Sequence, residues 1–152
     1  METLEQIIPA HPFLRGMDPD QHRILIGCAY NVTYDPGRFI FREGGHADRF
    51  YLIQDGRVSV ETQNDGRPIV VQTMGAGDVL GWSWIIPPHE WRFDARALEL
   101  THAVALDGNR LRAKCEDDTE FGYRLLKRMA HVLAVERNEM MKRLVEMERQ
   151  QG

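Results

Sequence analysis

The chain has 152 residues, of which 43% are hydrophobic and 28% are charged, and its formal net charge at pH 7 is −4. This length suffices for one domain that buries a core without cross-links, and the negative charge argues against direct binding to DNA or to an anionic membrane. The sequence contains no apolar run near the roughly 18 residues that a membrane helix needs, and its acidic N-terminus differs from a signal peptide, so we expect a cytoplasmic protein.

Residues 1–30 are predicted to form two short N-terminal helices. The first covers residues 3–8 and ends at Pro9. The second begins at Pro19, directly after Asp18, because an N-cap carboxylate followed by proline is a typical helix start. The apolar face of this second helix consists of Ile24, Leu25, Cys28 and Ala29. We expect it to pack on the domain that follows.

Residues 31–107 are predicted to be a mainly β domain. Turn sequences occur at Asp35-Pro36-Gly37, Asp55-Gly56 and Asp65-Gly66. The segments between and after them are rich in β-branched and aromatic residues. Strands are therefore expected at residues 38–42, 50–54, 58–62, 69–73 and 101–106. The spacing favours an antiparallel β-roll or jelly roll, the double-stranded β-helix.

Residues 108–150 are predicted to hold a short helix over 110–115, capped by Asn109, and a long helix over about 118–148. Leu125, Met129 and Val132 form one apolar stripe of the long helix, which can lie on the roll. A second stripe follows the 3-4 alternation of a coiled coil and extends beyond the reach of the roll.

The second stripe predicts a homodimer through the C-terminal helix. The candidate interface residues are Leu126, Ala130, Leu133, Arg137, Met140, Leu144 and Met147. Arg137 stands at a core position of this stripe, where it would weaken the pairing or set its register. The alternative is that all these apolar residues belong to an intramolecular core.

Three segments of the β domain resemble the cyclic nucleotide-binding domain of CRP/FNR-like regulators. They read P-G-R-F-I-F-R-E-G from Pro36, A-D-R-F-Y-L-I-Q-D-G-R-V-S-V from Ala47 and G-A-G-D-V-L-G from Gly75. The resemblance implies a sensor domain that dimerises through its last helix, which in some members closes over the ligand. The chain stops where a CRP-type activator would begin its winged-helix domain, so we expect a stand-alone regulatory domain.

The resemblance also places the ligand anchors of the family. A glutamate of the family binds the ribose hydroxyl and an arginine pairs with the cyclic phosphate, but the matching positions here hold Trp82 and Trp91. Strand alternation from Trp91 then points Phe93, Ala95 and Ala97 into the roll and their neighbours outward. A shift of one residue would instead bring Arg92 to the phosphate, but it would turn Asp94 and Arg96 inward at a cost of several kcal/mol unless they pair.

Aromatic residues dominate this segment and allow two interpretations. Trp82, Trp84, Trp91 and Phe93 fill the nucleotide pocket as core residues, or they line a pocket for a different ligand. The candidate pocket residues are Gly81, Trp82, Ser83, Trp84, Trp91, Arg92, Phe93 and Arg96.

Other chemistry has little support in the sequence. The six histidines lack metal-ligand spacing, Ser83 lacks a G-x-S-x-G context, and Cys28 and Cys115 stand far apart, as two reduced thiols would. We expect no catalytic residue, no metal and no certain cofactor, with a cyclic nucleotide as the family ligand whose anchors are replaced. Two functions stay open: a dimeric sensor of a small molecule, or an interaction module that binds a regulatory protein partner.

Overall fold

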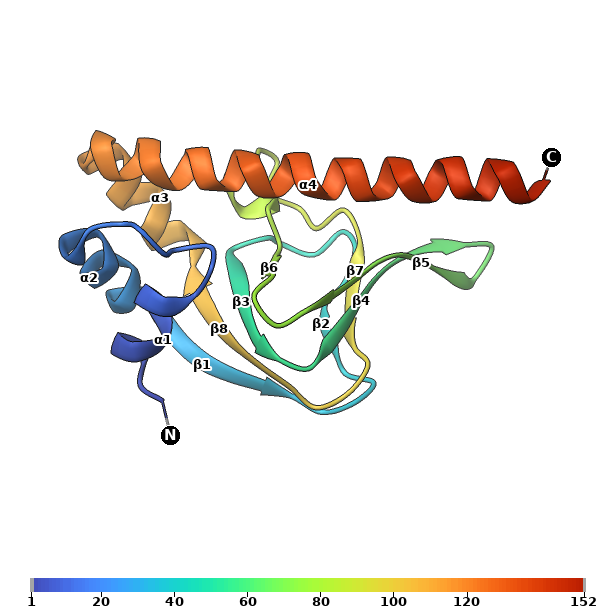
Figure 1. The fold of residues 1–152 in the computed structure, drawn as a ribbon, viewed down its shortest axis with the longest axis horizontal. Coiled ribbons are helices and arrows are strands. Elements are labelled where there is room, and N and C mark those ends of the chain that lie inside the picture. The colour runs from blue at the N-terminus through green and yellow to red at the C-terminus, as the bar shows by residue number, and fades with distance from the viewer. Residues whose placement is uncertain (1, 152) are drawn as a thin grey trace.

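A computed structural model describes residues 2–151 of the chain as a β-roll with helices at one end and one long helix across its top (Figure 1). Two four-stranded antiparallel sheets form the roll. The first has the order β1 (Ala29–Tyr34), β8 (Thr101–Asp107), β3 (Arg49–Asp55) and β6 (Val79–Leu80). The second has the order β2 (Phe39–Phe41), β7 (Asp94–Ala97), β4 (Arg57–Asn64) and β5 (Arg67–Gly75). The predicted fold class and all five predicted strands are confirmed.

The predicted turns join these strands. Asp65 and Gly66 both have positive φ, 52° and 77°, and connect β4 to β5 as a two-residue hairpin requires. Gly56 has φ 102° between β3 and β4, and a Cβ at this position would lie 2.4 Å from Thr101 Oγ1. Only glycine therefore fits the β3–β4 turn.

The N-terminal helices pack against the open end of the roll. Helix α1 (Leu4–Ala10) continues through Pro9 for one further residue, beyond the predicted end. Helix α2 (Pro19–Gly27) starts as predicted, because Asp18 accepts a hydrogen bond from the Gln21 amide at 2.9 Å and completes a capping box.

The C-terminal helices are α3 (Gly108–Asp117) and α4 (Thr119–Gln151). The prediction that Asn109 caps α3 was wrong, because Asp107 is the N-cap and accepts from the Arg110 amide at 3.2 Å. Strand β8 runs directly into α3, since Gly108 packs on the Asp48 backbone with no room for an intervening turn.

The core consists of two apolar clusters. One fills the interior of the roll and includes Tyr51, Val60 and Leu80. The other lies between the first sheet and the helices, where Leu125 and Met129 of α4 are buried and Val132 packs beside them. The first predicted stripe of α4 therefore holds the helix on the roll.

Candidate ligand pocket and helical interface

The candidate pocket lies under α4, where the chain leaves β6 and later returns to β7. Gly81 follows β6 with φ 91° and leads into the short 3₁₀ helix η1 (Ser83–Ile85). The returning segment passes Trp91 before it enters β7. This path brings residues 81–83 and 91–93 to opposite walls of one small space.

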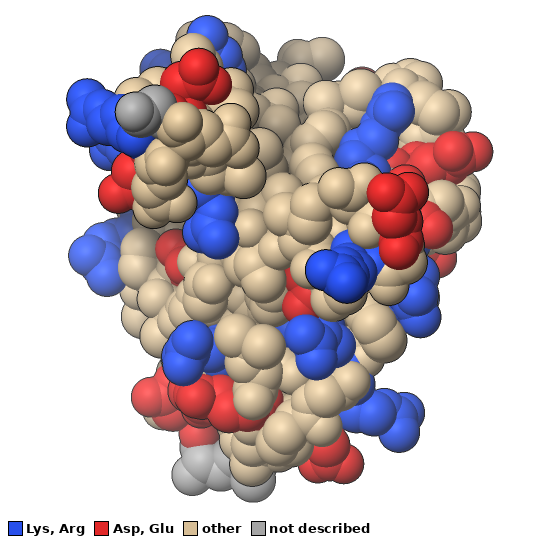
Figure 2. Space-filling model, turned by 90° about the vertical axis from the view of Figure 1, so that its right-hand side faces the viewer, with Lys and Arg blue, Asp and Glu red and all other residues tan. Residues whose placement is uncertain are grey.

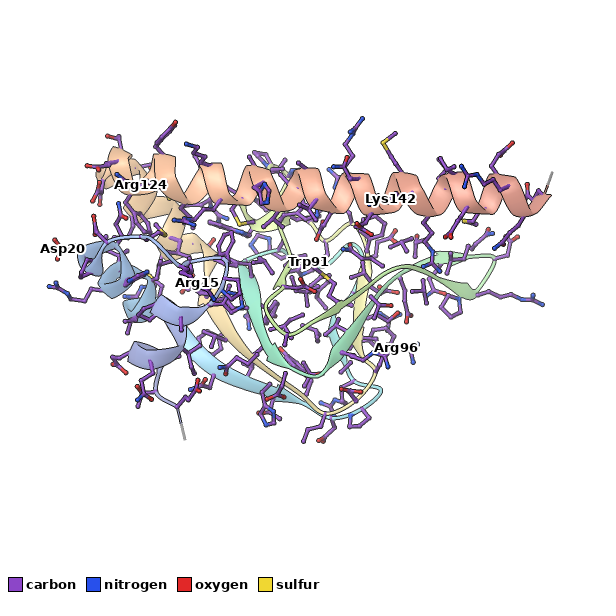
Figure 3. All side chains as sticks on the ribbon, in the orientation of Figure 1. Arg15, Asp20, Trp91, Arg96, Arg124 and Lys142 are labelled. Carbon is purple, nitrogen blue, oxygen red and sulfur yellow. The ribbon has the colours of Figure 1, made fainter. Side chains whose placement is uncertain are left out.

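Trp91 lies inside the roll beneath α4, as the unshifted register predicts (Figure 3). Its side chain is 6% exposed and stacks on Phe41 with ring centroids 3.8 Å apart and an angle of 9° between the rings. A Cβ at Gly81 would lie 2.8 Å from the Trp91 ring, so the indole rests directly on the Gly81 backbone. Glycine at position 81 is thus required both by its φ and by the neighbouring ring.

A cavity of about 20 Å³ is all that is left beside Trp91; it is called the closed cavity below because side chains nearly fill it, although it is partly open to solvent. Such a volume holds about one water molecule, whereas small-molecule pockets usually measure about 300–1,000 Å³. Its wall is made by Phe41, Val60, Leu80, Gly81, Trp82, Ser83, Trp91, Arg92, Phe93, Glu136 and Met140. In this conformation the roll has no room for a nucleotide.

Six of the eight predicted pocket residues line the closed cavity, and two lie elsewhere. Trp84 is fully buried in the other core cluster, where it stacks on Phe50 at 4.9 Å and its carbonyl accepts from Arg112. The turn of η1 sends Trp84 toward α3 and away from Trp91. Arg96 lies on the outer face of β7, where it pairs with Glu61 at 2.8 Å (Figure 3).

Arg92 is exposed at the mouth of the closed cavity. Ala95 and Ala97 of β7 are buried against the roll interior, and Phe93 packs beside them. The strand therefore adopts the register in which Trp91 points inward, and Arg92 does not enter the roll.

Asp94 lies on the outer face of β7 but is buried, although we expected an outward and exposed side chain. Its carboxylate accepts from the Glu43 amide at 2.7 Å, from Gln63 at 3.2 Å and from Arg42 at 3.4 Å. Burial by itself would raise the pKa of Asp94, but these donors outweigh it and hold the pKa below the usual value.

Glu136 is a pocket residue that the sequence analysis missed. It projects from α4 toward the roll, is 8% exposed and lines the closed cavity together with Trp82. Burial raises the pKa of Glu136 to about 7, while a hydrogen bond from Trp82 opposes this shift and the charge of Asp78 adds to it. The signal was present in the spacing, because Glu136 follows Val132 by four positions in the stripe that faces the roll.

The second stripe of α4 divides into two groups. Leu133 and Met140 are half-buried, and Met140 lines the closed cavity. The other predicted interface residues are exposed, with Leu126 at 46% and Leu144 at 65%. Two further apolar residues of the helix, Met141 and Val145, are exposed as well. The single chain thus leaves an apolar strip along the solvent side of α4 uncovered.

An open cleft of about 970 Å³ runs along another side of α4. Its floor is apolar, with Phe13, Met74 and Val132, and its rims carry both acidic and basic residues, among them Asp78 and Lys127. Charges of both signs also alternate at the end of the molecule that carries the β4–β5 hairpin (Figure 2).

Residues 2–151 carry neither a cluster of metal ligands nor a helix that could span a membrane. In that part of the chain no three His, Cys, Asp or Glu side chains gather closely enough to hold a metal ion. Of the helices described there, none is both long and apolar enough to cross a membrane.

Comparisons with known proteins agree with this geometry at the level of the family. The family model of the cyclic nucleotide-binding domain matches residues 31–118. The chain is 27% identical over 138 residues to the CRP-like cAMP-activated global transcriptional regulator of Mycobacterium tuberculosis, a match that covers 90% of this chain and 62% of the regulator. It is 28% identical over 141 residues to the cAMP-dependent protein kinase regulatory subunit of Schizosaccharomyces pombe, covering 82% of this chain and 33% of the subunit. The chain thus spans less than two thirds of the length of these relatives.

Solved structures share the fold at low sequence identity. A Geobacter metallireducens protein named for cyclic nucleotide binding superposes with a TM-score of 0.79 at 22% identity, covering 90% of this chain and 98% of that one. The c-di-GMP responsive global regulator CLP of Xanthomonas campestris superposes with a TM-score of 0.73 at 17% identity, covering 86% and 65%. At these identities the likeness shows the fold alone.

Proposed function

The chain belongs to the cyclic nucleotide-binding domain family, and we propose that it is a regulatory domain whose nucleotide pocket is filled by its own side chains. In this proposal the protein acts as a homodimer through α4. Its output is an interaction with another protein that depends on the state of this helix. It neither catalyses a reaction nor requires cAMP or cGMP to fold into the closed form.

The position of Trp91 is the observation that carries the proposal. A cyclic nucleotide needs a cation for its phosphate, since an unpaired anion in an apolar site loses the charge-assisted bonds that offset its dehydration. Trp91 occupies the interior with a neutral ring, and the nearest arginine in sequence, Arg92, is exposed. The remaining 20 Å³ would have to grow more than tenfold to hold a ligand of drug size.

The uncovered strip on α4 supports the dimer. Exposed leucines such as Leu126 and Leu144 on one side of a helix are typical of a surface that pairs with another helix. Residues 121–129 anchor the start of the same helix on the roll. The binding of a partner to the exposed strip would therefore depend on how α4 lies over the pocket.

Calorimetry with cAMP and cGMP tests the nucleotide part of this proposal. We expect no measurable binding heat for either ligand at micromolar concentrations of the wild-type protein. Micromolar affinity for either ligand would contradict the filled pocket and would favour the shifted register with Arg92 on the phosphate. In that case Arg92→Ala should abolish binding, and the exposed Arg38→Ala should not.

A screen by thermal shift separates the interaction module from a sensor of some other ligand. A ligand present at 100 times its Kd adds about 2.7 kcal/mol to the stability of a protein that binds it only when folded. The screen uses cyclic dinucleotides, haem and fatty acids as probes. Stabilisation by one of them that is lost in Trp91→Ala would favour the sensor.

A further inference from the structure

The apolar side of α4 that faces the roll is interrupted by one ionisable residue. Leu125, Met129 and Val132 follow each other at helical spacing, and Glu136 takes the next position of that stripe. It is buried, although charged side chains are almost never buried without a partner. An apolar residue at position 136 would extend the packing of α4 on the roll. A buried carboxyl group instead lowers the stability of the fold, and the packing of the helix does not explain its presence.

Among the described residues, the surroundings of Glu136 offer its negative charge one hydrogen-bond donor but no cation. No Lys, Arg or His of residues 2–151 lies within ion-pairing distance of its carboxylate. The turn between β5 and β6 brings the carboxylate of Asp78, which repels it. Trp82, the residue before η1, donates a hydrogen bond, but this bond offsets the effect of burial only in part. Strand β5 contributes Gln72, whose Oε1 is buried without a hydrogen-bond partner.

The cations near this position are directed elsewhere. Arg128 and His131 of α4 line the open cleft with Glu136, but Arg128 donates to the Phe13 carbonyl at 3.2 Å. Lys127 lies 5.7 Å from the Tyr123 ring centroid, and Arg92 stands at the mouth of the closed cavity. His11 packs near Asp78, and burial lowers the pKa of His11 so that it is neutral near pH 7.

We propose that protonation of Glu136 holds the middle of α4 on the roll, and that its deprotonation lifts this part of the helix and opens the closed cavity. Glu136 and Met140 form the α4 side of that cavity, so their departure exposes its wall to solvent. The ends of α4 allow this motion, because Phe121 and Leu125 remain anchored in the core while the residues after Met140 are already exposed.

The switch rests on the proposed function in one respect, because the cavity that it opens is the one that Trp91 nearly fills. It does not depend on the dimer. Burial favours the neutral form of Glu136 and raises its pKa to about 7. The change between the two helix positions is therefore expected near neutral pH. A modest change of pH then shifts the population of the two helix positions.

Methyl NMR of the protein labelled with ¹³C-methyl methionine tests the switch, with Met140 and Met129 as internal reporters. On titration from pH 5 to pH 9 we expect the Met140 signal to move with a midpoint near 7, while the fully buried Met129 stays constant. Glu136→Gln should abolish the Met140 transition, because its amide has the size of the protonated acid but does not ionise. Glu139→Gln, an exposed change on the same helix, should leave it intact.

His131 of α4 lines the open cleft together with Glu136, and His131→Gln should keep the Met140 transition. A transition that survives in Glu136→Gln, or its absence from the wild type, would overturn the switch. If Glu136→Gln fails to fold, the ¹³C chemical shift of the Glu136 carboxyl group in the wild type decides, since a midpoint near 4.5 excludes the proposal. If calorimetry detects nucleotide binding, the proposal of a filled pocket is refuted, but the pH titration of Met140 still tests the Glu136 switch independently.

Discussion

In the proposed function, the side chain of Trp91 takes the place of a ligand. Its ring stacks on Phe41 and touches the Gly81 backbone, so contacts within the chain fill the interior of the roll. The resemblance to the family places an anion in this space. An anion needs charged or hydrogen-bonding partners, whereas an indole needs only apolar contacts and gains from burial. An empty ligand site lowers the stability of the fold. Filling it with an indole makes the same space part of the core.

Trp91→Ala is expected to lower the free energy of unfolding by roughly 3–5 kcal/mol, because it removes a buried aromatic ring and leaves a cavity. Chemical denaturation measures this loss, and Arg92→Ala at the exposed neighbouring position serves as the control with a change below about 0.5 kcal/mol. A small loss in Trp91→Ala together with a lost ligand response would indicate a working pocket.

Gly81→Ala is expected to destabilise the protein more than Gly66→Ala. Both glycines have positive φ, 91° and 77°, so both alanines are strained by the backbone. Only at Gly81 does the added Cβ also collide with the Trp91 ring, at 2.8 Å, while Gly66 has no atom within 4 Å. We expect the collision to add about 1–3 kcal/mol, measured by chemical denaturation. Equal losses of unfolding free energy in the two variants would show that the Trp91 ring moves aside for the added Cβ without a cost in stability.

In the proposed function, helix α4 combines two roles, since one side packs on the roll and a strip with Leu126 and Leu144 stays uncovered. The last buried residue of the stripe that faces the roll is Glu136, while the helix continues to Gln151. A helix that leaves its domain with exposed leucines is stable when a second helix covers them. The half-buried Leu133 and Met140 serve the roll, so they are poor positions for testing the dimer.

Leu126→Glu combined with Leu144→Glu is expected to yield a folded monomer, because two charges placed in a helical seam oppose pairing. Light scattering coupled to size-exclusion chromatography measures the mass, and circular dichroism checks the fold. Val135→Glu is the matched control, because Val135 is 44% exposed but lines the open cleft. A wild-type protein of monomeric mass, or a double variant that remains dimeric, would refute the seam.

At the scale of the whole molecule, two buried carboxyl groups oppose each other as the pH changes. Glu136 has a raised pKa, so it favours the fold at low pH and loses that contribution as the pH rises through about 7. Asp94 has a lowered pKa, so its contribution is present above the usual value of 3.8 and is lost as the pH falls through the pKa of the folded protein. Stability should therefore be greatest at mildly acidic pH.

Asp94→Asn is expected to lower the free energy of unfolding at pH 6 by roughly 1–3 kcal/mol, because the Glu43 amide, Gln63 and Arg42 lose a charged acceptor. The deficit should begin to shrink as the pH falls below 3.8, where the unfolded chain takes up the proton, and should vanish once the carboxylate of the folded protein is protonated at its lower pKa. Urea denaturation at several pH values measures both effects. Glu99→Gln, at an exposed position, should show neither, and a pH-independent deficit in Asp94→Asn would refute the role of the charge.

The sequence by itself determined the roll, its turns and the stripe of α4 that packs on it. Asp65-Gly66 dictates a tight hairpin through local backbone preferences, and the spacing of Leu125 and Met129 dictates which side of the helix is buried. Strand alternation together with the family resemblance allowed two registers for Trp91, and its burial in the structure selects the one in which it points inward. The turns and the stripe depend on residues that are near each other along the chain.

Only the tertiary structure decided which of these residues meet. Trp84 was grouped with Trp91 by closeness in sequence, but the turn of η1 sends it to the other core cluster. Glu136 lines the pocket from a helix about 45 positions after Trp91 in the sequence. The groups that donate hydrogen bonds to Asp94 lie on segments about 30 to 50 positions before it. Local patterns fix the direction of a side chain within its own element. The neighbours that bury it, shift its pKa or close a cavity against it come from elements whose relative placement depends on packing of the whole chain.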